Sequence, residues 1–324
     1  MKDLVFNIKT EEEFTETSLQ VFKHQFTNNK VYRSFCDLLY VHPSDVKTIQ
    51  QIPFLPIQFF KTREVLSSTE EIKETFTSSG TTGSVTSKHF VTDLSWYKES
   101  YLKGFKHFYG NIEDYVVLAL LPNYLERKGS SLVYMVDDLI KKSENPESGF
   151  FLNNEVDLAK KLQKLAKKGQ KVLLIGVSFA LLDLIEKHQF NLKNTIIMET
   201  GGMKGRRKEL IRSELHKLLS DGFGVDKIHS EYGMTELLSQ GYSTGNGIFN
   251  CPPWMKVLTR DTEDALTINT PGKSGGINII DLANYNSCSF IATQDLGKVH
   301  LNNSFEVIGR FDNSDIRGCN LMVL

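Results

Sequence analysis

Apolar residues follow two different spacings along this chain, and these spacings predict helices and strands. Between residues 10 and 40 they recur every three or four positions, which predicts helical structure. Farther on, continuous apolar runs of strand length alternate with amphipathic segments. The predicted strands are 115–121, 172–177 and 195–198, and the predicted helices are 157–168, 179–188 and 208–219. Strands that alternate with helices of about ten residues indicate an α/β fold with a largely parallel sheet.

The pattern changes near residue 250. Short alternating segments at 265–269, 276–280 and 290–293 are separated by Gly, Asn and Asp residues, which predicts a smaller β-rich sub-domain. Much earlier in the chain, the proline-rich stretch 52–56 predicts an extended connector.

Composition narrows the class of protein. The 324 residues include 38 basic and 39 acidic side chains, so no sequence-wide charge attracts nucleic acid or an anionic membrane. The N-terminus lacks the apolar run of a secretory signal, and the longest apolar stretch, 172–185, is too short and too polar to span a bilayer. Four widely separated cysteines favour neither a disulfide scaffold nor a zinc site; they are Cys36, Cys251, Cys288 and Cys319. We therefore expect a cytoplasmic protein with no nucleic-acid partner and no membrane span.

The strongest local signal is a run of hydroxyl side chains and glycines that begins at residue 77. It comprises Thr77, Ser78, Ser79, Gly80, Thr81, Thr82 and Gly83, and Lys88 follows shortly after. Glycine lets backbone N–H groups point at an anion, hydroxyls add donors, and an ammonium adds charge. The spacing is not that of a Walker A loop, because no Gly-Lys-Ser/Thr follows. The pattern favours a polyphosphate site, and a Ser/Thr/Gly surface loop is the alternative.

This run resembles the signature loop of the adenylate-forming superfamily, which includes acyl-CoA synthetases, peptide-synthetase adenylation domains and firefly-type luciferases. The resemblance implies ATP as a substrate and the large-domain architecture of that superfamily, with parallel-sheet sub-domains and a smaller β-rich one. Such a domain would cover residues 1–310. The superfamily continues with Pro-Lys where this chain has Val-Thr-Ser-Lys, so Lys88 is the displaced equivalent of the superfamily lysine.

Further motifs follow in the superfamily's order. Residues 231–236, Glu-Tyr-Gly-Met-Thr-Glu, are similar to its Tyr-Gly-x-Thr-Glu motif. The resemblance implies that the Tyr232 ring lies on adenine, that Thr235 bonds the α-phosphate, and that the Glu236 carboxylate holds Mg²⁺. A surface turn around Gly233 is the alternative for this motif alone.

Two more segments extend the resemblance over most of the chain. Gly201 and Gly202 follow a predicted strand, where the superfamily has a glycine-rich loop against adenine. Ala-Thr-Gln-Asp-Leu-Gly resembles the motif whose aspartate, here Asp295, accepts hydrogen bonds from the ribose. Gly-Arg-Phe-Asp-Asn is similar to the hinge motif, whose arginine, here Arg310, also contacts the ribose.

The chain ends soon after that hinge motif. Full-length superfamily members continue into a mobile domain that brings a lysine to the site, and we do not expect that lysine here. Because a carboxylate that attacks the α-phosphorus brings two anions together, some cation must offset the repulsion. The candidates are Mg²⁺ on Glu236, Lys88 and Lys204. We expect Lys204→Ala to slow adenylation strongly, and an unchanged pyrophosphate-exchange rate would remove Lys204 from these candidates.

The last residues and the segment 52–61 resemble one family in particular, the bacterial acyl-protein synthetases or long-chain fatty acid–protein ligases. The resemblance implies a ligase that activates a carboxylic acid, of the fatty-acid class, with ATP and Mg²⁺ and forms an acyl-adenylate. The acyl group then passes to Cys319, in a hinge-like tail over 311–324, and from there to an acyl reductase. A terminal cysteine without a role is the alternative.

Two other functions stay open at this point. The acyl group could pass instead to coenzyme A or to the pantetheine of an acyl carrier protein. The chain could also be a non-catalytic, nucleotide-binding homologue, although Glu236, Asp295 and Arg310 argue against decay of the site. His229, just before the second motif, would line the acyl pocket or fill the core.

Overall fold

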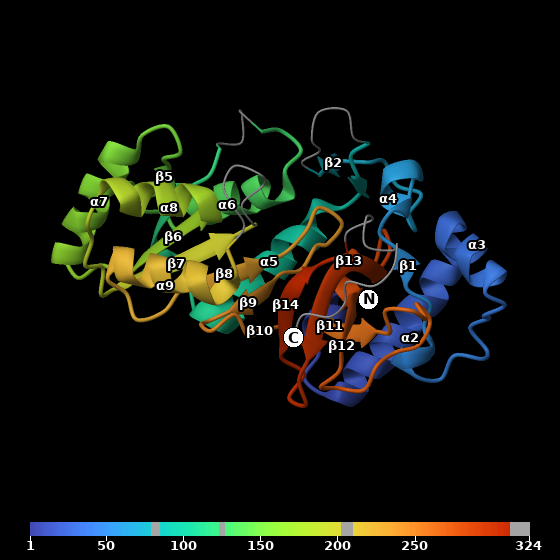
Figure 1. Cartoon of the computed structure of the whole chain (residues 1–324). Coiled ribbons are helices and arrows are strands. Elements are labelled where there is room, and N and C mark those ends of the chain that lie inside the picture. Colours follow the sequence, from blue (N-terminus) through green and yellow to red (C-terminus); the bar gives the residue numbers. More distant parts are fainter. Residues whose placement is uncertain (79–84, 123–126, 202–209, 312–324) are drawn as a thin grey trace.

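The protein was analysed as a computed structural model that describes residues 1–78, 85–122, 127–201 and 210–311. It has a helix-flanked half and a β-rich half, and the ribbon diagram shows them side by side (Figure 1). Within the described residues, one 12-stranded sheet runs through both halves. Strands β2 (Glu74–Thr77) and β3 (Lys88–Val91) form a separate antiparallel hairpin.

Five parallel strands form the core of the helix-flanked half, in the order β5-β4-β6-β7-β8. They are β4 (Val116–Leu120), β5 (Gly149–Phe150), β6 (Val172–Val177), β7 (Thr195–Thr200) and β8 (His229–Tyr232). Strands β4 and β6 are buried at every position, as expected for parallel strands covered on both faces.

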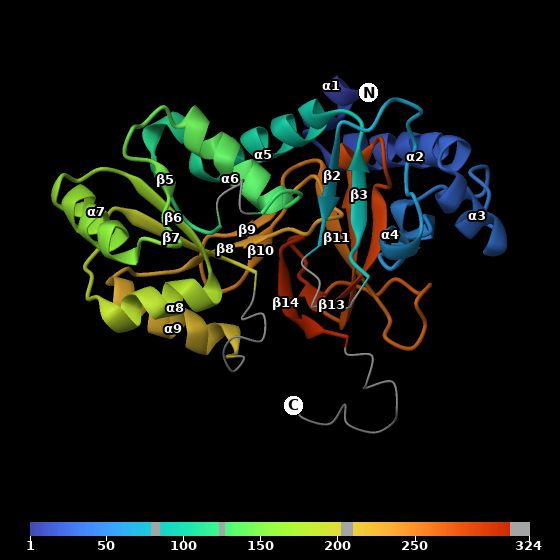
Figure 2. The same ribbon diagram turned by 90° about the horizontal axis from the view of Figure 1, so that it is seen from above.

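Helices cover both faces of these strands, and Figure 2 shows the two layers. On one face lie α5 (Leu94–Tyr109) and α6 (Ser131–Lys142), and on the other lie α8 (Ser178–Lys187) and α9 (Arg212–Phe223). Helix α7 (Glu155–Lys167) leads into β6, and the short 3₁₀ helix η2 (Ile112–Asp114) leads into β4. Because the strands are parallel, the carboxyl ends of β6, β7 and β8 meet at one edge, where ligands bind in α/β folds.

Antiparallel strands continue the sheet from β8 in the order β9-β10-β14-β13-β12-β11. They are β9 (Gly241–Ser243), β10 (Phe249–Asn250), β11 (Met255–Arg260), β12 (Ser274–Asp281), β13 (Phe290–Val299) and β14 (Phe305–Arg310). The short strand β1 (Leu55–Pro56) pairs in parallel with β13. The 3₁₀ helix η3 (Leu282–Asn284) follows β12.

N-terminal helices pack on this β-rich half (Figure 1). They are α1 (Lys2–Phe6), α2 (Glu11–Asn28), α3 (Lys30–Leu38), the 3₁₀ helix η1 (Ile49–Gln51) and α4 (Phe59–Thr62). A capping box between Thr10 and Glu13 starts α2. The buried Gln25 amide of α2 donates to the carbonyl of Asn284 over 2.9 Å, which fastens the helix to η3.

Most of the predicted elements are confirmed. The predicted strands at 115–121, 172–177 and 195–198 correspond to β4, β6 and β7, and the helices at 157–168 and 179–188 to α7 and α8. The helix predicted over 208–219 begins at Arg212 and extends to Phe223, with residues 208 and 209 outside the described part. The connector at 52–56 contains β1. The sub-domain division near residue 250 stays a prediction, and strands from both sides of it share one sheet.

The alternating segment 265–269 contains none of the strands of the sheet. Residues 265 and 266 form a turn, and an isolated bridge joins Ile268 to Arg260. The Asp261 carboxylate accepts from the backbone N–H of Glu263 over 2.9 Å, and the Asp264 carboxylate accepts from that of Leu266 over 3.0 Å. Aspartate side chains of this kind compete with strand pairing for the backbone donors.

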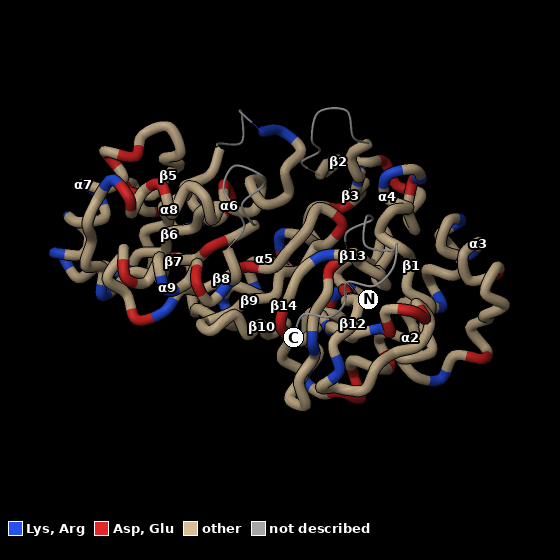
Figure 3. Tube along the Cα trace, in the orientation of Figure 1, with Lys and Arg blue, Asp and Glu red and all other residues tan. Residues whose placement is uncertain are grey.

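Two observations concern the surface. Lys and Arg residues are interspersed with Asp and Glu residues along the described chain (Figure 3). No helix in the described residues is both long enough and apolar enough to cross a membrane.

Candidate active site

The β2–β3 hairpin carries the two ends of the predicted phosphate loop. Thr77 and Lys88 face each other in register, and the backbone N–H of Thr77 donates to the carbonyl of Gly129 over 2.7 Å. The Ser78 hydroxyl accepts from the backbone N–H of Ser87 over 2.9 Å. The Lys88 side chain is exposed. The hairpin therefore fixes both ends of the loop, while residues 79–84 lie outside the described part of the chain.

Buried contacts fasten this hairpin to the loop that contains Glu236. In the middle of the hairpin, His89 lies with its Nδ1 2.9 Å from the carbonyl oxygen of Thr235. Burial lowers the pKa of His89 to about 4, so the ring is neutral at physiological pH and its Nδ1–H donates to that carbonyl. On the other side, the Asn284 amide donates to the carbonyl of Glu236 over 2.7 Å. The backbone of residues 235 and 236 is thus held from two directions.

The Glu236 side chain is buried, with 5% of its surface exposed. Burial raises the pKa of its carboxyl group above the ordinary value, while a hydrogen bond from Ser87 and the charges of Arg310 and Lys61 act in the opposite direction. Glu236 therefore lies against the start of β3 and close to two cationic side chains that come from distant parts of the sequence.

Tyr232 and Asp295 meet where β8 ends. The Tyr232 hydroxyl donates to the Asp295 carboxylate over 2.8 Å, and the Tyr232 ring packs against Phe249 and Phe305. Asp295 lies opposite Arg310 in the β13–β14 ladder. Burial raises the pKa of Asp295, and the Tyr232 hydrogen bond and the charges of Arg310 and Arg260 oppose that rise.

Arg310 connects the two carboxylates, because its charge acts on both Glu236 and Asp295. Its Nη2 also donates to the Gln294 side chain over 3.3 Å. Arg260 fixes the strand just before Asp295, since its guanidinium donates to the carbonyl of Thr293 over 2.6 Å. Two acids and an arginine from three different segments therefore lie in one region near the end of β8.

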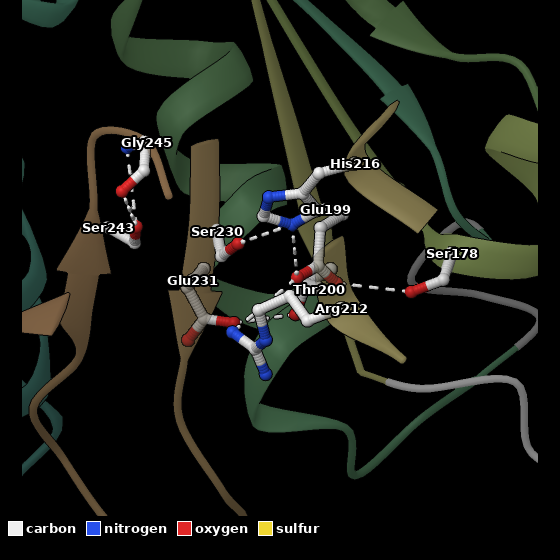
Figure 4. A network of polar contacts seen from close by, with 9 residues as sticks. All are labelled: Ser178, Glu199, Thr200, Arg212, His216, Ser230, Glu231, Ser243 and Gly245. Carbon is white, nitrogen blue, oxygen red and sulfur yellow. Dashed lines mark hydrogen bonds and ion pairs between the residues drawn. The ribbon is translucent and has the colours of Figure 1, made fainter. Parts of the chain in front are cut away.

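A second polar cluster lies beside this region, at the carboxyl ends of β7 and β8 (Figure 4). Glu199 accepts a hydrogen bond from Ser178 over 3.1 Å and lies 3.5 Å from His216 and 3.9 Å from Arg212. Burial would raise the pKa of Glu199, but the His216 hydrogen bond and the Arg212 charge outweigh it and lower the pKa. On the opposite face of the sheet, Glu231 has a different environment. It accepts from the Thr200 hydroxyl over 2.6 Å, and burial raises its pKa to about 7.

Most of the chain matches the family described as acyl-protein synthetase, LuxE. The matched residues are 5–112 and 130–324.

The chain belongs to the LuxE family of acyl-protein synthetases.

Two curated relatives agree with this assignment. A long-chain-fatty-acid–luciferin-component ligase from Aliivibrio fischeri is 25% identical, and the match covers 98% of this chain and 92% of the relative. A protein of the same name from Vibrio harveyi is 22% identical, with 93% and 84% covered. Family membership makes the protein a ligase that activates an acyl group and transfers it, as the sequence motifs predicted.

Solved structures show the fold. An open form of 2-hydroxyisobutyryl-CoA ligase is 12% identical with a TM-score of 0.67, and the match covers 94% of this chain and 75% of that one. ATP-bound MatB from Rhodopseudomonas palustris is 17% identical with a TM-score of 0.55, over 75% of this chain and 49% of MatB, so this match spans about half of MatB's length. The LuxE-family chain therefore has the adenylate-forming fold that the sequence predicted.

The structure brings several of the predicted site residues of this LuxE-family chain together. Those that meet are Thr77, Ser78 and Lys88 on the hairpin, and Tyr232, Thr235, Glu236, Asp295 and Arg310 around the end of β8. Others lie outside the described residues: Ser79, Gly80, Thr81, Thr82, Gly83, Gly202, Lys204 and Cys319. The ligand roles of all these residues stay predictions.

At two motif positions the local structure explains why the residue is glycine. Gly201 ends β7 with φ of 56°, in the left-handed region that favours glycine. A Cβ on Gly233 would lie 2.4 Å from the Glu231 carboxylate, so the buried acid leaves no room for a side chain there. His229, suggested for the acyl pocket or the core, is buried 3.3 Å from the Tyr109 hydroxyl.

Sequence reasoning missed some residues of the region. Glu231 is the first residue of the motif at 231–236, and Glu199 directly follows the apolar strand predicted at 195–198, which was the available signal. Lys61 closes the segment 52–61 that carried the family resemblance, but only the fold brings it near Glu236. Ser87 and His89 gave no signal of their own.

Proposed function

We propose that this acyl-protein synthetase binds ATP with Mg²⁺, converts a fatty acid to its acyl-adenylate, and transfers the acyl group to Cys319. The observation that carries the proposal is the convergence of Glu236, Asp295 and Arg310 beside the phosphate-loop hairpin. The names of the curated relatives, which specify a long-chain fatty acid, favour that class of acid.

The first step joins the acid to the nucleotide. An oxygen of the acid carboxylate forms a bond to the α-phosphorus of ATP, and pyrophosphate leaves. Asp295 would accept hydrogen bonds from the ribose hydroxyls, with Arg310 beside it, and the Tyr232 ring would lie along adenine. The hairpin hydroxyls, Lys88 and Lys204 would hold the phosphates.

Glu236 fits a magnesium site of the kind used with nucleotides. Mg²⁺ is usually held by one or two carboxylates together with substrate phosphates and water. Glu236 offers such a carboxylate beside the phosphate-loop hairpin, where it accepts a hydrogen bond from Ser87, and it would be the protein ligand of the ion. Bound there, Mg²⁺ would neutralise charge on the phosphates.

The second step moves the acyl group to the protein. The Cys319 thiolate would attack the acyl carbonyl, a thioester would form, and AMP would leave. The thioester would then deliver the acyl group to an acyl reductase or an acyl carrier protein. Because the reaction requires ATP, we place it in the cytoplasm.

One experiment tests the proposal. The protein is incubated with ATP, Mg²⁺ and clickable carboxylic acids of graded chain length, and pyrophosphate and hydroxylamine-sensitive protein label are measured. We expect both to appear with long-chain acids, and the label to disappear in Cys319→Ser while pyrophosphate release persists. Pyrophosphate with no protein label, but with thioester formed on added coenzyme A or carrier protein, would redirect the second step. No turnover with any acid would reject the proposal.

A further inference from the structure

The N-terminal segment that contains Lys61 is tied directly to the strand of Asp295. Strand β1 pairs in parallel with β13, with Leu55 opposite Ile291 and Pro56 opposite Ala292. The next residue, Ile57, donates its backbone N–H to the carbonyl of Ala292 over 2.9 Å. The chain then enters helix α4. Asp295 stands three residues beyond Ala292, so α4 starts beside the candidate site.

Helix α4 is also tied to the phosphate-loop hairpin. The buried Phe60 ring meets the His89 ring edge to face, with 5.8 Å between ring centroids. His89 in turn holds the carbonyl of Thr235, next to Glu236. A rigid chain of contacts therefore connects α4, β3 and the Glu236 loop.

Lys61 follows Phe60 in this helix and reaches the same region. Its side chain is exposed, and its charge acts on the Glu236 carboxylate. Among the described residues, no ion pair engages the Lys61 ammonium, whereas Arg310 bonds Gln294 and lies opposite Asp295. Arg310 is thus placed toward Asp295, and Lys61 toward the hairpin.

We propose that the Lys61 ammonium binds the β- and γ-phosphates of ATP during adenylation, an inference that rests on the ATP chemistry proposed above. In that step a carboxylate oxygen bonds to the α-phosphorus, and the bond from this phosphorus to the bridging oxygen breaks. The electron pair of the broken bond leaves with pyrophosphate, which gains negative charge. An ammonium at the leaving group stabilises that charge.

The test compares ATP with AMP, because only ATP carries the phosphates that Lys61 would bind. We expect Lys61→Met to weaken binding of a fluorescent ATP analogue about 10- to 100-fold, since it removes a charge-assisted hydrogen bond. Binding of the matching AMP analogue should stay within about twofold, which also shows that the variant is folded. The kcat/KM for ATP in acid-dependent pyrophosphate exchange should fall about 100-fold, with partial recovery in Lys61→Arg.

Arg63→Met is the matched control, because it removes an exposed cation from the same segment, and it should leave both affinities unchanged. Three results would overturn the role of Lys61: unchanged ATP affinity in Lys61→Met, equal loss of ATP and AMP affinity, or the same loss in Arg63→Met. If the wild-type protein binds neither nucleotide and catalyses no exchange, the proposed function fails, and the role of Lys61 fails with it.

Discussion

Asp281 and Asp295 lie on neighbouring strands of the β-rich half, yet their surroundings differ. Asp281 is fully buried and accepts from the backbone N–H groups of Leu238, Ser239 and Ala283 and from the Ser239 hydroxyl. For half-buried Asp295, the described side chains supply one hydrogen bond, from Tyr232.

The number of hydrogen-bond donors distinguishes the two acids: Asp281 stabilises the fold, whereas Asp295 can still accept hydrogen bonds from a ligand. A carboxylate has about four acceptor positions, so the partners of Asp281 fill it, while Asp295 keeps positions open. Leu238 and Ser239, which supply three of these donors, follow Glu236 closely along the chain, so Asp281 anchors the same loop whose other end meets Asp295 through Tyr232. Mutations should therefore separate stability from activity within one short region.

The largest expected effect is on activity, in Asp295→Ala. Losing a charged acceptor for the two ribose hydroxyls should lower kcat/KM for ATP about 100- to 1000-fold, with both ATP and AMP bound more weakly. The melting temperature should stay the same or rise, because a half-buried acid with few donors is removed. Asp264→Ala, in the exposed turn, is the control and should keep full activity. A large fall in melting temperature together with normal exchange kinetics would make Asp295 a structural residue.

The next effect is a dependence of stability on pH, and it comes from Glu231, a buried acid with few hydrogen-bond donors and no predicted ligand. Its pKa is raised from 4.5 to about 7 by burial. The stability that comes from this raised pKa is complete below pH 4.5 and is lost as the pH rises toward 7, since the unfolded chain ionises first. Between pH 5 and 8, wild type should lose about 2 to 3 kcal/mol of unfolding free energy relative to Glu231→Gln. Urea titrations at both pH values measure this, and a constant difference would contradict the assignment.

Asp281→Asn should mainly reduce stability. The amide cannot accept from all the donors that surround Asp281, so a buried N–H group is left unpaired, which costs about 2 kcal/mol. Its kcat/KM for ATP, measured well below the melting temperature, should change far less than in Asp295→Ala. Equal losses of activity in Asp281→Asn and Asp295→Ala would contradict the assignment of Asp281 to stability and Asp295 to binding.

The sequence predicted the parallel strands and the order of the site motifs for a physical reason. Runs such as 172–177 are buried on both faces, so their composition alone marks them, and the motifs follow where such strands end. Helix α5 was not predicted, since its many aromatic and polar residues blur the helical spacing. The effect of the Lys61 charge on Glu236 could not be predicted either, because it depends on β1 pairing with a strand from the other end of the chain.

The smallest effect tests the contact that joins the two motifs, the bond between Tyr232 and Asp295. Tyr232→Phe removes one hydrogen bond of 2.8 Å and keeps the ring against Phe249 and Phe305. We expect KM for ATP to rise about fivefold, equivalent to about 1 kcal/mol, because Asp295 loses the donor that orients it. Tyr115→Phe, which removes a bond of 2.8 Å to the carbonyl of Tyr109 away from the site, should cost stability without changing KM. If both variants change KM equally, the hydroxyl of Tyr232 acts through general stability, and Asp295 must be oriented by Arg310 alone.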